Sequence, residues 1–426
     1  MKQKKPFLWG ASVAAHQVEG NNHNQWTTWE LQNANVLAAK ARPQYDKLPN
    51  WPAIKSLATS PDNYISGKAA DHYHLYKQDF ALAAQLNFNA LRFSIEWSRV
   101  QPNSSKDWDH EAVAHYRDYL KAMRAKGLEP VVTLWHFTNP DWFEALGGFA
   151  KPRNRKYLVA YARRIMEELG EYIHYVIPIN EPDTYALEGY LRAEWPPQQS
   201  GVVISMWVYF NLCMTHRAIY KALKHDEQQS QSTDSPRQYT VAFNKGFTYY
   251  YRADGDIRSR LAEWASRFVF DDFILFLVMR RYDLIAVNYY FSVRFKGFKV
   301  YNPPSERRSD LGWGMHPNHL GDVLIRLAKY HKAPLMVTES GVADTADIYR
   351  KWWITENLKG IQRAQKRGAR VVGYLHWALL DNFEWAHGRW PNFGLIAVDY
   401  KTFKRTIRPS ASWYASAIAL FKSREK

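Results

Sequence analysis

The sequence predicts an α/β protein built as a single (β/α)8 barrel. Eight short apolar runs of strand length alternate with amphipathic stretches whose apolar residues recur at helical spacing. Eight such units can close a parallel barrel, the usual size of which is about 250 residues before insertions. The competing architecture, a doubly wound open sheet, usually carries a glycine-rich nucleotide turn, and neither G-x-G-x-x-G nor G-x-x-x-x-G-K-[ST] occurs here. The active site is therefore expected at the C-terminal ends of the strands.

The predicted strands are mostly rich in β-branched or aromatic residues. They cover residues 7–12, 90–95, 130–135, 175–180, 239–244, 284–290, 335–339 and 371–377. The predicted helices between them include residues 73–86, 111–126, 157–169, 206–224, 320–330 and 349–367. No linker rich in Pro, Gly or Ser divides the chain, and the most linker-like segment, residues 227–237, is predicted to be a polar loop. Residues 1–426 are therefore predicted to form one domain.

The composition excludes several classes of protein. Of 426 residues, 46% are hydrophobic and 15% aromatic, which is ample for a large core and rules out global disorder. The single cysteine, Cys213, excludes an intramolecular disulfide and a thiolate zinc cluster. No metal or other cofactor is expected. The longest apolar run near the middle, residues 273–279, is far shorter than the roughly 20 residues of a membrane-spanning helix.

The chain is strongly basic. It has 57 Lys and Arg against 41 Asp and Glu, a formal net charge of +16. Such an excess suggests nucleic acid, an anionic membrane surface or acidic ligands as partners. Because the charges are spread along the chain rather than gathered in one run, a nucleic-acid-binding barrel is the less favoured hypothesis. The sequence predicts no oligomeric state.

The N-terminal segment allows two interpretations. Lysines at positions 2, 4 and 5 precede the apolar residues 7–15, as in a secretory signal peptide. The polar residues Gln17 and Glu19 follow at once, which favours a first core strand instead. On this interpretation the protein is expected to be cytoplasmic.

Polar or aromatic side chains lie at or near the ends of all eight predicted strands. They include Gln17, Arg92, His136, Asn180, Glu181, Asn244, Asn288, Tyr290, Glu339 and Trp377. Glu181 and Glu339 each follow a run of core residues directly, and their strands are expected on opposite sides of the barrel mouth. Two facing carboxyl groups with different surroundings are what glycoside hydrolysis requires. The alternative from the residues alone is a pair of structural acids held in ion pairs.

Several motifs along almost the whole chain resemble those of glycoside hydrolase family 1, the β-glucosidase/β-galactosidase family. They lie at residues 7–20, 71–74, 91–99, 133–140, 180–182, 288–290, 337–341 and 376–385. Single motifs such as Asn180-Glu181-Pro182 recur in other barrel glycosidases, whereas all of them in this order are highly specific.

The resemblance implies catalytic roles for two carboxyl groups. Glu181 is similar to the general acid/base, and Glu339 is similar to the nucleophile that forms a covalent glycosyl-enzyme. In retaining enzymes such a pair lies roughly 5–5.5 Å apart. Arg92 and Tyr290 suit a nucleophile that must stay ionised, and Asn180 resembles the residue that holds the sugar 2-OH.

The same resemblance implies the sugar-binding residues, of which Trp377 would form a flat floor under the ring. The expected set is Gln17, His136, Asn288, Trp377, Glu384 and Trp385. By family analogy Glu384 accepts hydrogen bonds from the 4-OH and 6-OH. Phospho-sugar members of the family usually replace this carboxylate, and its charge would repel a 6-phosphate.

The predicted function is that of a retaining exo-β-glycosidase without a cofactor. Its substrates would be unphosphorylated β-glycosides or oligosaccharides, β-glucosides first and β-galactosides or β-fucosides next. The alternatives are a catalytically weak sugar-binding barrel and a transglycosylase of the same family. One departure from the family is Ser340, where Asn usually follows the nucleophile, and it is expected to modulate activity rather than abolish it.

Overall fold

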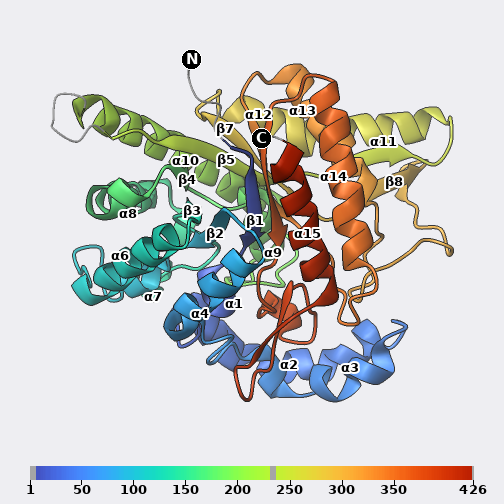
Figure 1. Ribbon diagram of the computed structural model, residues 1–426. Helices are drawn as coiled ribbons and strands as arrows, with labels where there is room; N and C mark the ends of the chain where they lie inside the picture. The colour runs from blue at the N-terminus through green and yellow to red at the C-terminus, as the bar shows by residue number, and fades with distance from the viewer. Residues whose placement is uncertain (1–5, 231–236, 425–426) are drawn as a thin grey trace.

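A computed structural model describes residues 6–230 and 237–424 of the chain, and its centre is a closed barrel of eight parallel strands (Figure 1). Around the barrel the strands are ordered β1-β11-β10-β7-β5-β4-β3-β2. Their bounds are β1 (Leu8–Ser12), β2 (Ala90–Ser94), β3 (Glu129–Thr133), β4 (Tyr175–Ile177), β5 (Thr240–Gly246), β7 (Leu284–Tyr289), β10 (Leu335–Ser340) and β11 (Val371–Trp377). The predicted (β/α)8 barrel is confirmed.

Helices surround the barrel, and short strands and helices are inserted in its loops (Figure 1). The helices are α1 (Ala15–Val18), α2 (Gln25–Tyr45), α3 (Trp51–Ala58), α4 (His72–Gln85), α5 (Trp97–Val100), α6 (His110–Ala125), α7 (Asp141–Ala145), α8 (Arg155–Leu169), α9 (Pro182–Tyr190), α10 (Val202–Ser230), α11 (Ile257–Arg267), α12 (Phe273–Leu277), α13 (Leu320–Tyr330), α14 (Arg350–Lys366) and α15 (Pro409–Arg424). The inserted strands are β6 (Tyr249–Arg252), β8 (Ser292–Lys296) and β9 (Lys299–Val300) in one sheet, and β12 (Ile396–Val398) and β13 (Arg405–Ile407) in another. None of these helices is long and apolar enough to cross a membrane.

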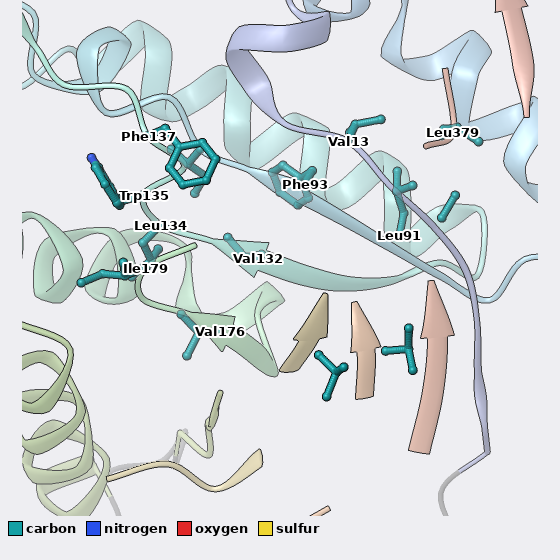
Figure 2. Close-up of a cluster of buried hydrophobic side chains, with 14 of the residues drawn as sticks. Val13, Leu91, Phe93, Val132, Leu134, Trp135, Phe137, Val176, Ile179 and Leu379 are labelled. Atoms are coloured by element: carbon teal, nitrogen blue, oxygen red, sulfur yellow. The ribbon is translucent and has the colours of Figure 1, made fainter. Parts of the chain in front are cut away.

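Alternation along the strands sorts side chains between two cores. Successive strand residues point to opposite faces, so in β2 Leu91 and Phe93 belong to the outer core under the helices, whereas Ala90 belongs to the barrel interior. Figure 2 shows the outer cluster, in which Leu91, Phe93 and Val132 lie between strands and helices. The same alternation directs Arg92 inward, and the hydrogen bonds described below confirm that it points there.

The structure corrects two local predictions. Residues 227–230 are the last turn of α10 rather than a loop, and the rest of the predicted loop up to residue 236 lies outside the described residues. Strand β4 ends at Ile177, three residues before the predicted end, so Asn180 and Glu181 lie in the loop that leads into α9. The lysines at positions 2, 4 and 5 also lie outside the described residues, whereas the apolar residues after them form β1.

Candidate active site

The strands β4, β7 and β10 bring the two predicted carboxyl groups to one end of the barrel. Glu181 lies in the loop between β4 and α9, and Glu339 lies in β10, where it is paired in register with Asn288 of β7. Both carboxylic residues are buried, with exposed fractions of 8% for Glu181 and 4% for Glu339. Asn288 also contacts Glu181, because its amide nitrogen donates to Oε1 of Glu181 at 2.7 Å.

Glu339 is held by one cation and one hydroxyl group. The Arg92 guanidinium forms an ion pair and hydrogen bond with Oε1, and the Tyr290 hydroxyl donates to Oε2 at 2.5 Å. Arg92 is itself fixed by a bond from its Nε to the Thr133 hydroxyl at 3.0 Å. A carboxylate accepts such donors from both sides without needing a proton of its own. These contacts suit an ionised carboxylate.

Glu181 has different surroundings. Its Oε1 accepts from Asn288, and its Oε2 accepts from the Thr184 hydroxyl at 2.8 Å. Its backbone is in the left-handed region, with φ at 33°, and Pro182 follows as the first residue of α9. Proline suits this first helical position, and a left-handed conformation is costly for glutamate and is often found at functional sites.

Burial and neighbouring charge set the protonation of Glu181. Loss of water, followed by the nearby charges of Glu339 and Asp183, raises the pKa of this carboxyl to about 8, even though the hydrogen bonds from Asn288 and Thr184 act in the opposite direction. At neutral pH Glu181 is therefore mostly a neutral acid. The site thus offers a proton donor and, beside Arg92, a carboxylate.

Asn180 connects the two carboxyl groups through the side chains that hold them. Its Oδ1 accepts from Arg92 at 2.6 Å and from Asn288 at 3.3 Å, so its Nδ2 must be the group that donates to Nε2 of His136, 3.3 Å away. Burial and then the charge of Arg92 lower the pKa of His136 well below its ordinary value, so the ring is neutral. The proton of the neutral ring is therefore on Nδ1. This nitrogen has no partner among the described residues, which makes it a free donor.

Glu384 and Gln17 form a second polar group at this end of the barrel. Oε2 of Glu384 accepts from the Asn382 amide at 2.7 Å and from the Gln17 amide at 3.4 Å. The Gln17 nitrogen also donates to the backbone oxygen of Phe383 at 2.9 Å, while its Oε1 has no partner in the described part of the chain. Burial raises the pKa of Glu384 to about 7.

Aromatic rings line the same region. The ring of His136 lies nearly parallel to those of Trp377 and Trp385, at interplanar angles of 16° and 14°. The centroid of each Trp ring is 6.2 Å from that of His136. Trp385 is held within an aromatic cluster, with its ring centroid 4.7 Å from that of Trp26 and 5.4 Å from that of Trp195. Flat apolar faces beside hydrogen-bonding groups suit a sugar ring, which is apolar on its faces and polar at its edge.

The residues after Glu339 have structural tasks. A Cβ on Gly341 would lie 1.8 Å from the backbone oxygen of Trp377, so only glycine fits there. The Ser340 side chain lies away from Glu339 and is fully buried, where its hydroxyl is 2.8 Å from the Asn357 amide and 3.1 Å from Nε1 of Trp353. Ser340 therefore anchors β10 to α14 and does not touch the carboxyl groups.

Sequence reasoning missed several supporting residues. Thr133 and Thr184 orient Arg92 and Glu181, and Asn382 orients Glu384. Thr184 and Asn382 lie three and two positions from the carboxylates that they contact, so local spacing could have singled them out. The buried Lys245 pairs with Asp183 at 3.0 Å and with Asp271 at 3.1 Å, a contact between distant segments that no sequence motif indicates. Asn288, expected to bind sugar, donates through its nitrogen to Glu181 and accepts through its oxygen from the Thr338 hydroxyl.

The fold and this pair of unlike carboxyl groups define a class, the (β/α)8-barrel glycoside hydrolases. Within that class, the chain belongs to glycosyl hydrolase family 1, whose model matches residues 2–240 and 249–422. The family resemblance inferred from the sequence is confirmed, and the protein is a glycoside hydrolase.

Known proteins match this chain over almost its full length. A protein of Acetivibrio thermocellus named beta-glucosidase A is 25% identical, over 97% of this chain and 97% of its own length. A beta-galactosidase of Pyrococcus woesei is 26% identical, over 94% of both chains. Among solved structures, a beta-glycosidase from Pyrococcus horikoshii is 31% identical with a TM-score of 0.82, covering 98% of this chain and 95% of the other.

Proposed function

We propose that this protein is a retaining, exo-acting β-glycosidase in which Glu339 is the nucleophile and Glu181 the general acid/base. The observation that carries the proposal is the difference between the two buried carboxyl groups. Glu339 is paired with Arg92, whereas burial raises the pKa of Glu181 to about 8. One group is thus suited to attack and the other to give up a proton at neutral pH.

In the first step, Glu181 donates its proton to the glycosidic oxygen while a Glu339 oxygen attacks the anomeric carbon. The bond to the aglycone breaks, the aglycone leaves as an alcohol, and the sugar is bound to Glu339 as an ester. Esterification removes the charge of Glu339, which is the second-largest influence raising the pKa of Glu181. Without that charge the pKa of Glu181 falls, so Glu181 stays ionised after giving up its proton and can act as the base. It takes a proton from the attacking water, and that water releases the sugar with its original β configuration.

We propose unphosphorylated β-glucosides as the preferred substrates. Glu384, Gln17 and His136 would bind the sugar hydroxyls, because Oε1 of Gln17 and Nδ1 of His136 are buried polar atoms that have no partner in the described part of the chain. Trp377 would lie under the ring. The relatives named β-glucosidase and β-galactosidase support this class of sugar, and a galactoside differs from a glucoside only at the 4-OH.

A panel of nitrophenyl glycosides tests the proposed activity. We expect release of nitrophenol from the β-glucoside, lesser rates with the β-galactoside and β-fucoside, and a much lower rate with the 6-phospho-β-glucoside. No hydrolysis of any substrate in the panel would support the sugar-binding alternative. Oligosaccharide products in place of free sugar would support a transglycosylase.

The pH dependence of the first step follows from the raised pKa of Glu181. The acid form is required, so kcat/KM for nitrophenyl β-glucoside should fall as the pH rises through about 8, up to tenfold per pH unit beyond it. A dinitrophenyl glucoside is the control, because its leaving group needs no proton. Its kcat/KM should stay level over the same pH range, and a parallel fall for both substrates would contradict the assignment of Glu181.

Substrate choice should respond to Glu384. In Glu384→Ser, kcat/KM on the β-glucoside should fall about 10- to 100-fold, because each charge-assisted hydrogen bond contributes about 1.5–3 kcal/mol. The ratio of 6-phosphoglucoside to glucoside activity should rise, since a buried carboxylate beside the phosphate is gone and the molecule carries a net charge of +16. Glu384→Gln, which keeps the shape, is the matched variant. An unchanged ratio in both would mean that Glu384 does not face the 6-position.

We also propose that residues 1–426 form one domain and that the protein is cytoplasmic. In support of one domain, the C-terminal helix α15 contacts the first strand, where the rings of Trp9 and Phe421 lie 5.2 Å apart. In support of the location, the apolar stretch that resembles the core of a signal peptide is strand β1, and its cleavage would remove one strand of the barrel.

A further inference from the structure

Helix α11 has its apolar side facing the solvent. Ile257, Leu261, Trp264 and Phe268 recur at helical spacing, and their exposed fractions are 59%, 48%, 53% and 45%. Ser259 is the one fully buried side chain of this helix, and its hydroxyl bonds Asp254 at 2.6 Å and the Gly297 backbone at 2.7 Å. A helix on the surface of a globular protein normally has the opposite arrangement.

The apolar surface continues beyond α11 through the π-helical turn Phe268–Asp272 into α12. Val269 and Phe270 are 41% and 47% exposed, Phe276 is 68% exposed and Met279 is 55% exposed. Beside α12 lies a groove of about 630 Å³ lined by Phe268, Asp272, Leu275, Phe276, Met279, Arg280, Tyr330 and His331. We call these exposed residues of 257–279, together with Tyr330, the apolar face. In Figure 1 α11 projects at the right of the barrel and α12 lies beside α13.

Buried ion pairs hold this segment in place from the inside. Asp271, fully buried within the π-helical turn, pairs with Lys245 of β5 at 3.1 Å and with Arg326 of α13. Because breaking such a buried pair is costly, the neighbouring side chains of Val269 and Phe270 cannot turn inward to cover themselves. The apolar face is therefore a stable feature of the surface.

Cations without acidic partners surround the apolar face. Arg260 lies on α11, Arg280 lines the groove, and Lys329 and Lys332 flank Tyr330. All four are exposed, and none forms an ion pair with a carboxylate in the part of the chain that the structure describes. Aromatic and aliphatic side chains surrounded by Arg and Lys are typical of helices that lie in the headgroup region of a membrane.

We propose that the apolar face docks the protein on the surface of an anionic lipid bilayer. The bilayer offers an apolar interior for the side chains of Trp264, Phe268 and Phe276. Its anionic headgroups offer negative charges for the surrounding cations. A second copy of the chain would bring like cations together, in a molecule that already carries +16. Nucleic acid would match the cations, but its phosphate backbone offers nothing apolar to the projecting aromatic rings.

The test is co-sedimentation of the full chain with lipid vesicles. One set of vesicles contains phosphatidylcholine with about a third phosphatidylglycerol and the other phosphatidylcholine alone, at about 0.05 M and about 0.5 M salt. We expect binding to the anionic vesicles, weaker binding at high salt, and little binding to the neutral vesicles. The double variant Trp264→Ser/Phe268→Ser should bind the anionic vesicles at least about tenfold more weakly, and so should Arg260→Glu/Arg280→Glu at low salt.

Matched controls separate docking from general stickiness or misfolding. Leu31→Ser and Leu420→Ser remove leucines that are 68% and 53% exposed on α2 and α15, and they should bind vesicles as the parent does. All variants should keep the parent's activity on a water-soluble nitrophenyl glucoside. Failure of the parent to bind anionic vesicles, or equal losses in control and apolar-face variants, would overturn the proposal. A dimer in sedimentation velocity that Trp264→Ser/Phe268→Ser converts to monomer would instead identify a second copy as the occupant.

Discussion

Glu339→Gly is expected to lose hydrolysis of β-glucosides by a factor on the order of 10⁶, the scale of loss when an enzyme's nucleophile is removed. Glu339 is the carboxylate that Arg92 and Tyr290 hold at the end of the barrel, and no described neighbour offers a second carboxylate with the same contacts. The measurement is kcat/KM on nitrophenyl β-glucoside. Glu339→Gln, which keeps the shape but not the charge, should be equally inactive.

A rescue experiment distinguishes a missing nucleophile from a damaged fold. Removing Glu339 leaves the buried Arg92 guanidinium without its partner, so the free energy of unfolding should fall. Formate or azide can occupy the vacated space beside Arg92 and attack the sugar in place of Glu339. Restored release of nitrophenol by Glu339→Gly in formate would show an intact site, whereas substantial activity without any added anion would contradict the role of Glu339.

Glu181→Gln is expected to lower kcat/KM about 10²- to 10⁴-fold for substrates whose aglycone needs a proton. The loss should be largest for an alkyl β-glucoside, smaller for nitrophenyl and smallest for dinitrophenyl β-glucoside, because the leaving group becomes progressively more acidic. Glu188→Gln is the matched control, since Glu188 lies on α9, the helix that Glu181 precedes, but pairs with Arg192. Equal losses on all three substrates would mean that Glu181 does not protonate the aglycone.

The barrel could be predicted from the sequence because its strands are buried on both faces and therefore appear as apolar runs. The elements inserted in the barrel's loops could not be predicted in this way. Helix α2 buries Ala34, Ala38 and Ala41, which give only a weak periodic signal beside its many polar residues. Helix α11 has a clear apolar period, but that period points to the solvent, so burial reasoning would place the wrong side against the core.

The site residues were predictable where a strand carries them or a motif marks them. Arg92, Glu339 and Trp377 lie in strands, and Glu181 lies in the short loop after β4, so alternation and the position of the barrel mouth place them. Arg92 and Tyr290 were expected beside Glu339, but the other partners of these residues were not predictable. Thr133 reaches Arg92 across 41 positions in sequence, through the pairing of β2 with β3, and Asn288 reaches Glu181 across 107. Such contacts appear only once the strands are assembled.

The most direct test of the central claim, that Glu339 attacks the sugar and Glu181 moves the proton, is the configuration of the glycosyl azide formed by two variants. In Glu339→Gly, azide attacks the substrate from the vacated side and should give the α-glycosyl azide in a single inversion. In Glu181→Ala, azide attacks the glycosyl-enzyme formed on Glu339 and should give the β-glycosyl azide. Proton NMR of the products from an activated glucoside distinguishes the two anomers. Opposite anomers are the result predicted here, and the same anomer from both variants would contradict the assignment of the two carboxyl groups.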